Sequence, residues 1–264
     1  MAKILALPIG LPPKEAVEYF QRKGFRLSFS WMDMMREEHA KAFTVAKVMR
    51  ADILEDIRRA VDRAIAGGTT LEQFRRELTP LLQAKGWWGR GMMTDPKDGA
   101  TKDVQLGSPR RLATIYDTNL RTSLSAGRWE QIDRTKKRRP YLRYIHSGAL
   151  NARHQHKAWH GLVLPIDHVF WKTHFPPNGW HCGCWAQQLS DRDLERYGYQ
   201  VSPDPEVRYT VWRNPRTGEK RRVPVGVDPG FDYNPGVAGR AHYDELLASR
   251  AAAAPADLRE ALAS

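Results

Sequence analysis

The chain of 264 residues has very little cysteine and no long apolar run. Its only cysteines are Cys182 and Cys184, and one intervening residue is poor spacing for an ordinary disulfide. No stretch approaches the roughly 18 apolar residues that a membrane-spanning helix needs. Prolines interrupt the apolar start of the chain, and no small-residue cleavage site follows it. We therefore expect neither a secreted disulfide scaffold nor a membrane protein. Synthesis in a reducing cytoplasm fits best, with the first residues as a packed or partner-bound arm.

Acidic residues are scarce relative to basic ones. There are 42 Lys and Arg against 30 Asp and Glu, and residues 107–157 alone carry +9 of the net +12. The densest part is a basic block made of Arg134, Lys136, Lys137, Arg138 and Arg139. Such a block releases counterions when it meets phosphates, and it binds nucleic acid without reading its sequence. A solvated loop and a contact with an acidic protein surface are the alternatives.

Common catalytic signatures are absent as well. We find no phosphate-binding glycine loop, no nucleophile elbow, no zinc-protease motif and no internal repeat. The sequence therefore predicts a protein that is not an enzyme.

The first 90 residues are predicted to be helical. Residues 14–22 follow two prolines, and apolar positions from Val45 to Ile65 recur at steps of three or four up to Gly67 and Gly68. Thr69 and Glu72 match a capping box for a further helix. Residues 85–107 hold five glycines and a proline, which predicts a linker or an exposed loop.

The rest of the chain mixes helices and strands. Ser108 and Pro109 predict a helix start, and this helix should extend to about residue 135. Strands are expected at 141–146 and 162–164, and a hairpin with a basic turn at 207–227 around Gly218. The Ala-rich residues 243–264 predict a frayed or partner-dependent helix. We therefore predict an α+β chain with a helical N-terminal region (1–90), a compact mixed α/β domain (108–190), and a C-terminal hairpin with a helical tail (191–264).

Histidines and both cysteines cluster in the middle of the sequence. Seven of the nine histidines lie between residues 146 and 181. If residues 152–160 form a helix, His156 and His160 project from one face about a turn apart. Together with Cys182 and Cys184 they would make a tetrahedral zinc site of the usual structural kind. The rival ligands are His154, His168, His174 and His181.

Two other interpretations of this cluster stay open. The histidines and cysteines could be ordinary members of a tryptophan-rich core. A catalytic metal is the other alternative.

The same region carries a long ordered string of residues. It reads Arg153-x-x-His156-x-x-x-His160-Gly161, then Leu164-Pro165-x-Asp167-His168-x-Phe170-Trp171, then His174-Phe175-Pro176-Pro177-Asn178-Gly179-Trp180-x-Cys182-x-Cys184. This string resembles the phage Mu protein F-like family, minor head proteins that carry the phage head morphogenesis domain. The sequence departs from the pattern at Gly183, where Arg is usual, and at Val169, where Pro often precedes Phe-Trp.

The resemblance implies a virion protein of the phage head, made in the cytoplasm of the bacterial host. A few copies would associate with the portal during procapsid assembly, with roles in DNA packaging or ejection. The region 1–90 would contact the portal or scaffold, and the basic block would contact packaged double-stranded DNA without sequence preference.

The alternative function is a metal-dependent DNA nuclease of the His-Asn-His type, because Asp167-His168 and Asn178 lie near the cysteine pair. Such an enzyme needs an open metal position and a water-activating base. A free-standing DNA-binding module is disfavoured, because the sequence shows no recognition helix and no finger repeat.

Overall fold

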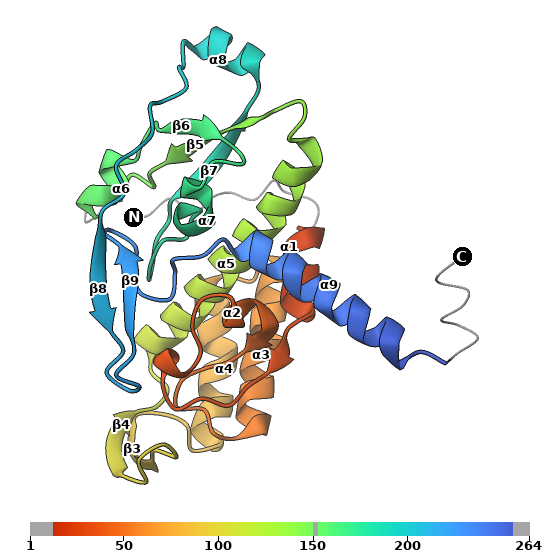
Figure 1. Cartoon of the computed structure of the whole chain (residues 1–264). Helices are drawn as coiled ribbons and strands as arrows, with labels where there is room; N and C mark the ends of the chain where they lie inside the picture. The colour runs from red at the N-terminus through yellow and green to blue at the C-terminus, as the bar shows by residue number, and fades with distance from the viewer. Residues whose placement is uncertain (1–12, 150–152, 256–264) are drawn as a thin grey trace.

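The computed structural model describes residues 13–149 and 153–255, and it shows helices combined with small sheets (Figure 1). The predicted N-terminal arm and the end of the C-terminal tail lie outside the described residues. The helices are α1 (Lys14–Gln21), the 3-10 turn η1 (Trp31–Asp33), α2 (Glu38–Lys41), α3 (Ala51–Gly67), α4 (Leu71–Ala84), α5 (Pro109–Thr135), α6 (His154–Ala158), α7 (Phe170–His174), α8 (Asp191–Tyr197) and α9 (Pro235–Ala253). The strands are β1 (Gly24–Phe25), β2 (Ala42–Phe43), β3 (Arg90–Thr94), β4 (Thr101–Gln105), β5 (Tyr141–Ile145), β6 (Val163–Pro165), β7 (Trp185–Leu189), β8 (Tyr209–Arg213) and β9 (Lys220–Pro224).

The N-terminal helices α1, α3 and α4 pack against α5. Helix α1 reaches its second half, where Glu15 pairs with Arg134. Helix α3 buries one apolar stripe and ends at Gly68, whose φ of 67° suits glycine. The predicted capping box is one residue out of place. Thr70, not Thr69, caps α4, and Gln73 completes the box by accepting a 2.9 Å hydrogen bond from the Thr70 amide.

Residues 85–107 form a hairpin rather than the predicted linker or loop. Strands β3 and β4 pair antiparallel, with Arg90 opposite Gln105. Trp87 and Leu106 flank the hairpin and are buried in the same core as Leu112 of α5. The prediction was wrong because the glycines serve tight turns at both ends of a hairpin whose strands place only Met93 and Val104 against the core.

The middle of the chain forms a three-stranded antiparallel sheet in the order β6-β5-β7. The strands predicted at 141–146 and 162–164 are thus confirmed. The second half of α5 supplies Ile132 to a second core, which also contains Leu142 and Trp171. Helix α5 therefore joins the two hydrophobic cores. Figure 1 shows it as one continuous helix.

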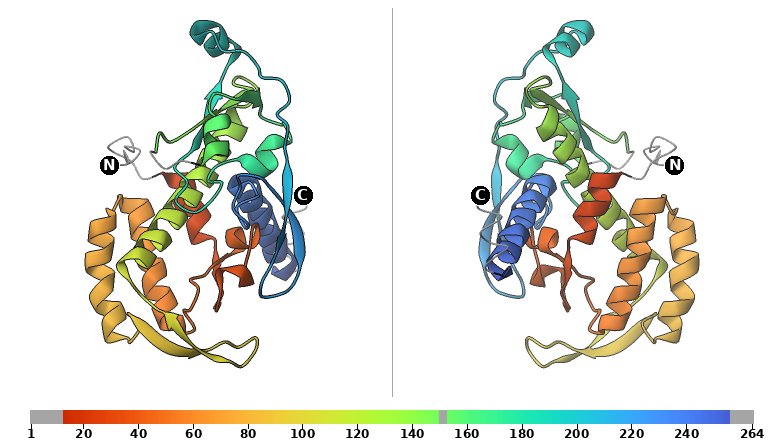
Figure 2. Two further views of the ribbon diagram at one scale, coloured as in Figure 1. Left: turned by 90° about the vertical axis from the view of Figure 1, so that its left-hand side faces the viewer. Right: turned by 90° about the vertical axis from the view of Figure 1, so that its right-hand side faces the viewer.

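The C-terminal part contains the predicted hairpin, in which β8 and β9 pair around Gly218. Helix α9 starts eight residues earlier than predicted, because the Asn234 side chain caps it by accepting from the Gly236 amide at 3.0 Å. A Cβ on Gly236 would lie 2.2 Å from the Trp129 side chain, so only glycine permits this contact with α5. Figure 2 shows α9 on one side of α5, with α3 and α4 on the other.

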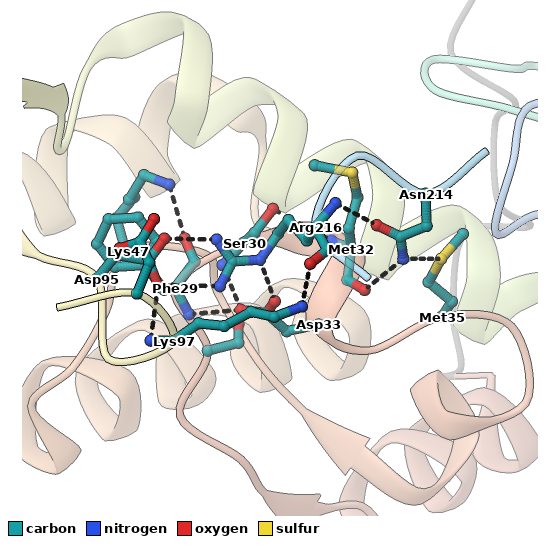
Figure 3. A network of polar contacts seen from close by, with 12 residues as sticks. Phe29, Ser30, Met32, Asp33, Met35, Lys47, Asp95, Lys97, Asn214 and Arg216 are labelled. Carbon is teal, nitrogen blue, oxygen red and sulfur yellow. Dashed lines mark hydrogen bonds and ion pairs between the residues drawn. The ribbon is translucent and has the colours of Figure 1, made fainter. Parts of the chain in front are cut away.

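An ion-pair cluster ties three distant segments together (Figure 3). Arg216, in the β8–β9 turn, reaches Asp33 of η1 at 2.5 Å and Asp95 of the β3–β4 turn at 2.6 Å. The Arg216 side chain is only 13% exposed and the Asp95 side chain is fully buried. Arg216 therefore stabilises the fold and, unlike an exposed basic side chain, is not available for a phosphate contact.

No helix in the described part of the chain is long and apolar enough to cross a membrane.

Candidate metal centre

Three of the predicted ligands converge on one buried point. His156 is on α6, while Cys182 and Cys184 lie on the loop before β7. The His156 Nδ1 atom is 3.6 Å from the Sγ atom of Cys182 and 3.6 Å from that of Cys184. Both cysteines are free thiols, and the three residues are only 3%, 4% and 9% exposed.

The spacing of the three ligand atoms fits zinc. With Zn–S bonds of about 2.3 Å and Zn–N bonds of about 2.05 Å, a tetrahedral angle separates nitrogen and sulfur by about 3.6 Å. Both measured nitrogen–sulfur distances equal this value. Imidazole and thiolate are also the donors that zinc prefers.

A hydrogen bond to the Gly226 carbonyl fixes the orientation of the His156 ring. Its Nε2 atom lies 2.8 Å from the Gly226 carbonyl oxygen. Because a carbonyl only accepts, Nε2 must carry the proton, which leaves the Nδ1 lone pair facing both sulfurs. Gly226 has a φ of 97°, and a Cβ there would lie 2.5 Å from Gln155, so this approach requires glycine.

The two thiols influence each other strongly. A hydrogen bond from Cys182, together with His156 and Tyr144, lowers the pKa of Cys184. The hydrogen bond with Cys184 and burial raise the pKa of Cys182. One of the two sulfurs is thus readily ionised, as a metal ligand must be.

His160 is not brought into this group. Helix α6 ends at Ala158, so the helix that was expected to align His156 with His160 is too short. His160 is exposed and its Nδ1 atom accepts a hydrogen bond from the His146 amide at 3.1 Å. Within the residues that the structure describes, the potential metal ligands at this point are His156, Cys182 and Cys184.

The rival histidines have other contacts. His168 pairs with Asp204 at 2.5 Å, and His181 pairs with Asp117 at 3.2 Å. His174 is buried and stacks on Phe170, and burial lowers its pKa to about 4. His154 is exposed at the start of α6.

Residues that sequence reasoning missed support the ligands. Tyr144 and Asn178 are fully buried, and the Tyr144 hydroxyl donates to the Asn178 side chain at 2.8 Å. Asp228 accepts from Arg153 at 2.5 Å and from the Trp180 amide at 2.9 Å, which fixes the loop that carries the cysteines. The ordered string included Arg153 and Asn178, but nothing in the sequence pointed to Tyr144 or Asp228.

The five residues of the basic block lie at the end of α5 and in the following turn, and all are exposed. Three of them are paired: Arg134 with Glu15 at 2.5 Å, Lys136 with Asp133 at 2.7 Å, and Arg139 with Asp193 at 3.0 Å. Within the described residues, Lys137 and Arg138 form no ion pair.

The model of the phage Mu protein F like family matches residues 55–187 of the chain, just over half of it. The chain belongs to this family. The matched residues include all three buried ligands and the basic block.

Two curated relatives extend the similarity of this Mu F-like chain. It is 40% identical over 270 aligned residues to the protein of Escherichia phage Mu named as a capsid assembly protein F, covering 97% of this chain and 61% of the relative. It is 36% identical to the Mu-like prophage FluMu F protein of Haemophilus influenzae, covering 80% of this chain and 53% of the relative. The chain therefore spans between half and two thirds of the length of these relatives. No solved structure matches it.

Proposed function

We propose that this Mu F-like chain acts in phage head morphogenesis as a minor capsid protein. The observation that carries the proposal is the 40% identity, across 97% of this chain, to a protein named for capsid assembly. In this function the chain contacts other capsid proteins, and the helical region 1–90 contacts the portal or scaffold. Its place is the virion, after synthesis in the cytoplasm of the bacterial host.

We propose that a structural zinc ion stabilises the middle of the protein and that His156, Cys182 and Cys184 bind it. The support is the match between the 3.6 Å nitrogen–sulfur distances and a tetrahedral zinc site. When bound, the metal supplies free energy of folding, because its ligands are assembled only in the folded chain. The protein's own residues prepare the site, since the Gly226 carbonyl sets the His156 tautomer.

A catalytic role for the metal is the second candidate, because three protein ligands leave one position of a tetrahedron open, as in catalytic zinc sites. Burial argues against it, since ligands that are 3%, 4% and 9% exposed give a DNA strand no access. The residues that suggested a His-Asn-His nuclease also have other partners. His168 pairs with Asp204, and Asn178 accepts a hydrogen bond from Tyr144. Metal-dependent cleavage of plasmid DNA that is lost in His156→Ala would favour the catalytic role of the metal over the structural one.

We further propose that the basic block contacts packaged DNA without sequence preference. Lys137 and Arg138 offer charges with no acidic partner in the described residues. The three paired side chains are 46% to 61% exposed, and surface pairs of this kind contribute little and can be exchanged for phosphate.

The head-assembly function is tested in a phage that carries this gene. Deleting the gene should abolish or deform heads in electron micrographs, and the wild-type gene in trans should restore them. His156→Ala should restore fewer heads than His160→Ala, which removes an exposed histidine outside the metal group. Normal heads in the deletion strain would refute the proposal.

A further inference from the structure

A lysine is buried near the N-terminus without an acidic partner. Lys23 follows α1 and is only 5% exposed. Its Nζ atom lies 4.6 Å from the centre of the Tyr19 ring, and no carboxylate in the described part of the chain pairs with it. Burial, and secondarily Arg58, lower the pKa of Lys23 to about 7. A buried ammonium group is costly unless an anion accompanies it.

Lys23 lines a cavity of about 50 Å³ between η1, α2, α5 and the segment 229–233. The polar side chains in its lining are those of Lys23, His39, Thr118, Asn119 and Thr122. The buried Thr118 hydroxyl has no hydrogen-bond partner in the described residues. The apolar side of the cavity is Trp31, Trp180 and Phe231, whose rings pack edge to face at 5.9 and 5.0 Å. A single water needs roughly 10–15 Å³, so the cavity has room for one small group.

The charges around the cavity leave one positive charge to be matched. Burial, Lys23 and other neighbours lower the pKa of His39 to about 4, so this imidazole is neutral at pH 7. The nearby acids Glu37 and Glu38 pair with Arg36 at 3.1 Å and Arg26 at 2.9 Å.

The remaining ionisable groups near Lys23 do not neutralise it. The buried Asp232 of the segment 229–233 pairs with Arg36 at 3.4 Å. Arg58 donates to the Gln21 carbonyl at 2.9 Å. Burial raises the pKa of both Tyr19 and Tyr233, which keeps these phenols uncharged. Lys23, whose pKa of about 7 leaves a large protonated fraction at neutral pH, is therefore the group that gives the cavity its positive charge.

We propose that this cavity binds a carboxylate group, with the Lys23 ammonium as its counter-ion and the Thr118 hydroxyl as a further donor. A single buried positive charge matches a monoanion, whereas a phosphate dianion would leave an uncompensated negative charge beside the buried lysine. The aromatic side of the cavity suits the carbon end of the ligand. The carboxylate is a free small acid, or the chain terminus or acidic side chain of another protein.

The first test uses the full-length protein with sodium acetate as the probe. Acetate should raise the unfolding temperature in a saturable way beyond sodium chloride at equal ionic strength, and calorimetry should give a dissociation constant. Lys23→Met should weaken acetate binding at least tenfold. The control is Lys14→Met, because Lys14 lies on the same segment and its side chain is 83% exposed. Equal acetate binding by Lys23→Met and wild type would refute the site.

Two further measurements apply even if Lys23→Met fails to fold. Because acetate binds the protonated lysine, its affinity for the wild type should fall about tenfold per pH unit above pH 7. Thr118→Val should weaken binding several-fold. A flat pH profile, or tighter binding of inorganic phosphate than of acetate, would overturn the carboxylate assignment.

Short peptides distinguish the sources of the carboxylate. Tighter binding of a peptide with a free C-terminus than of its amidated form would identify a chain terminus. Tighter binding of an amidated peptide that ends in Glu than of its Gln counterpart would identify an acidic side chain. Binding of acetate but of none of these peptides would identify a free small acid.

Discussion

His156 uses both of its ring nitrogens, one toward the cysteines and one toward the Gly226 carbonyl. Replacing it with Ala should abolish zinc binding and lower the free energy of unfolding by several kcal/mol, because metal binding is coupled to folding. His160→Ala should keep the metal, since His160 lies outside the group of ligands. Metal content by mass spectrometry and urea unfolding of the two variants measure this difference. Zinc lost from His160→Ala but retained by His156→Ala would contradict the ligand assignment.

His174 should make stability depend on pH. The pKa of His174 is about 4 in the folded protein against 6.5 for an ordinary histidine, mainly because the side chain is buried. The unfolded chain therefore binds its proton first, and the stability present above about pH 6.5 is lost as the pH falls toward 4. The loss amounts to about 3 kcal/mol.

Urea unfolding of wild type and His174→Phe at several pH values checks this prediction. The variant keeps an aromatic ring stacked on Phe170 but removes the titrating group. The difference in unfolding free energy between the two proteins should change between pH 7 and pH 4.5. A constant difference would show that His174 does not titrate in this way.

The sequence could identify the ligand types but only part of the geometry. His156 and the cysteines were found from residue type and spacing, and they do meet in space. The expected position of His160 depended on a helix longer than the five residues of α6. Tyr144 and Asp228 come from segments distant in the sequence, and only the fold shows that they lie beside the cysteine loop.

At the scale of elements, the Arg216 cluster joins two hairpins to η1. Arg216→Ala would leave the fully buried Asp95 carboxylate without this partner, so stability should fall strongly. Arg221→Ala is the matched control, because Arg221 lies on the same hairpin and pairs with the exposed Glu219. Thermal unfolding should show a much larger loss for Arg216→Ala. Equal losses would mean that the cluster does not stabilise the fold.

Elements with a clear local signal were predicted well, and the others were not. Ser108 and Pro109 start α5 as expected, and Gly218 turns the C-terminal hairpin. The hairpin at β3 and β4 escaped prediction because both of its faces are partly exposed and no apolar alternation marks it. Its stability comes from flanking residues such as Trp87, which are buried against other segments.

At the scale of the whole molecule, α5 makes the N-terminal and middle parts depend on each other. Leu112 and Ile115 pack among the N-terminal helices, while Ile132 packs in the middle core. A fragment of residues 108–190 would expose the first two side chains to water, so we expect it to aggregate or lose fixed structure. A fragment of residues 13–255 should stay folded. Circular dichroism and two-dimensional NMR spectra of both fragments check this, and a well-folded 108–190 fragment would show that the two cores are independent.

The proposed DNA contact of the basic block would displace counterions from phosphates, so its prediction is a salt dependence. If the five residues neutralise about four phosphates, the logarithm of affinity for duplex DNA should fall against the logarithm of salt with a slope near −3.6. Replacing Lys137 and Arg138 with Ser should reduce the steepness by about 1.8, because each lost phosphate contact contributes about 0.9. Zinc content should not change, since these exposed residues lie outside the metal group.

A control with the same loss of charge separates local contact from general attraction. Lys14→Ser with Lys172→Ser removes two exposed lysines outside the basic block. Because a phosphate contact is local whereas net charge acts on the whole molecule, only the Lys137 and Arg138 replacement should flatten the slope. Affinities for several unrelated duplexes should be equal at each salt concentration, because nothing in the block reads base edges. A slope that is the same in both double variants would place DNA binding elsewhere on the protein, and a strong preference for one duplex would reject contact with packaged DNA of any sequence.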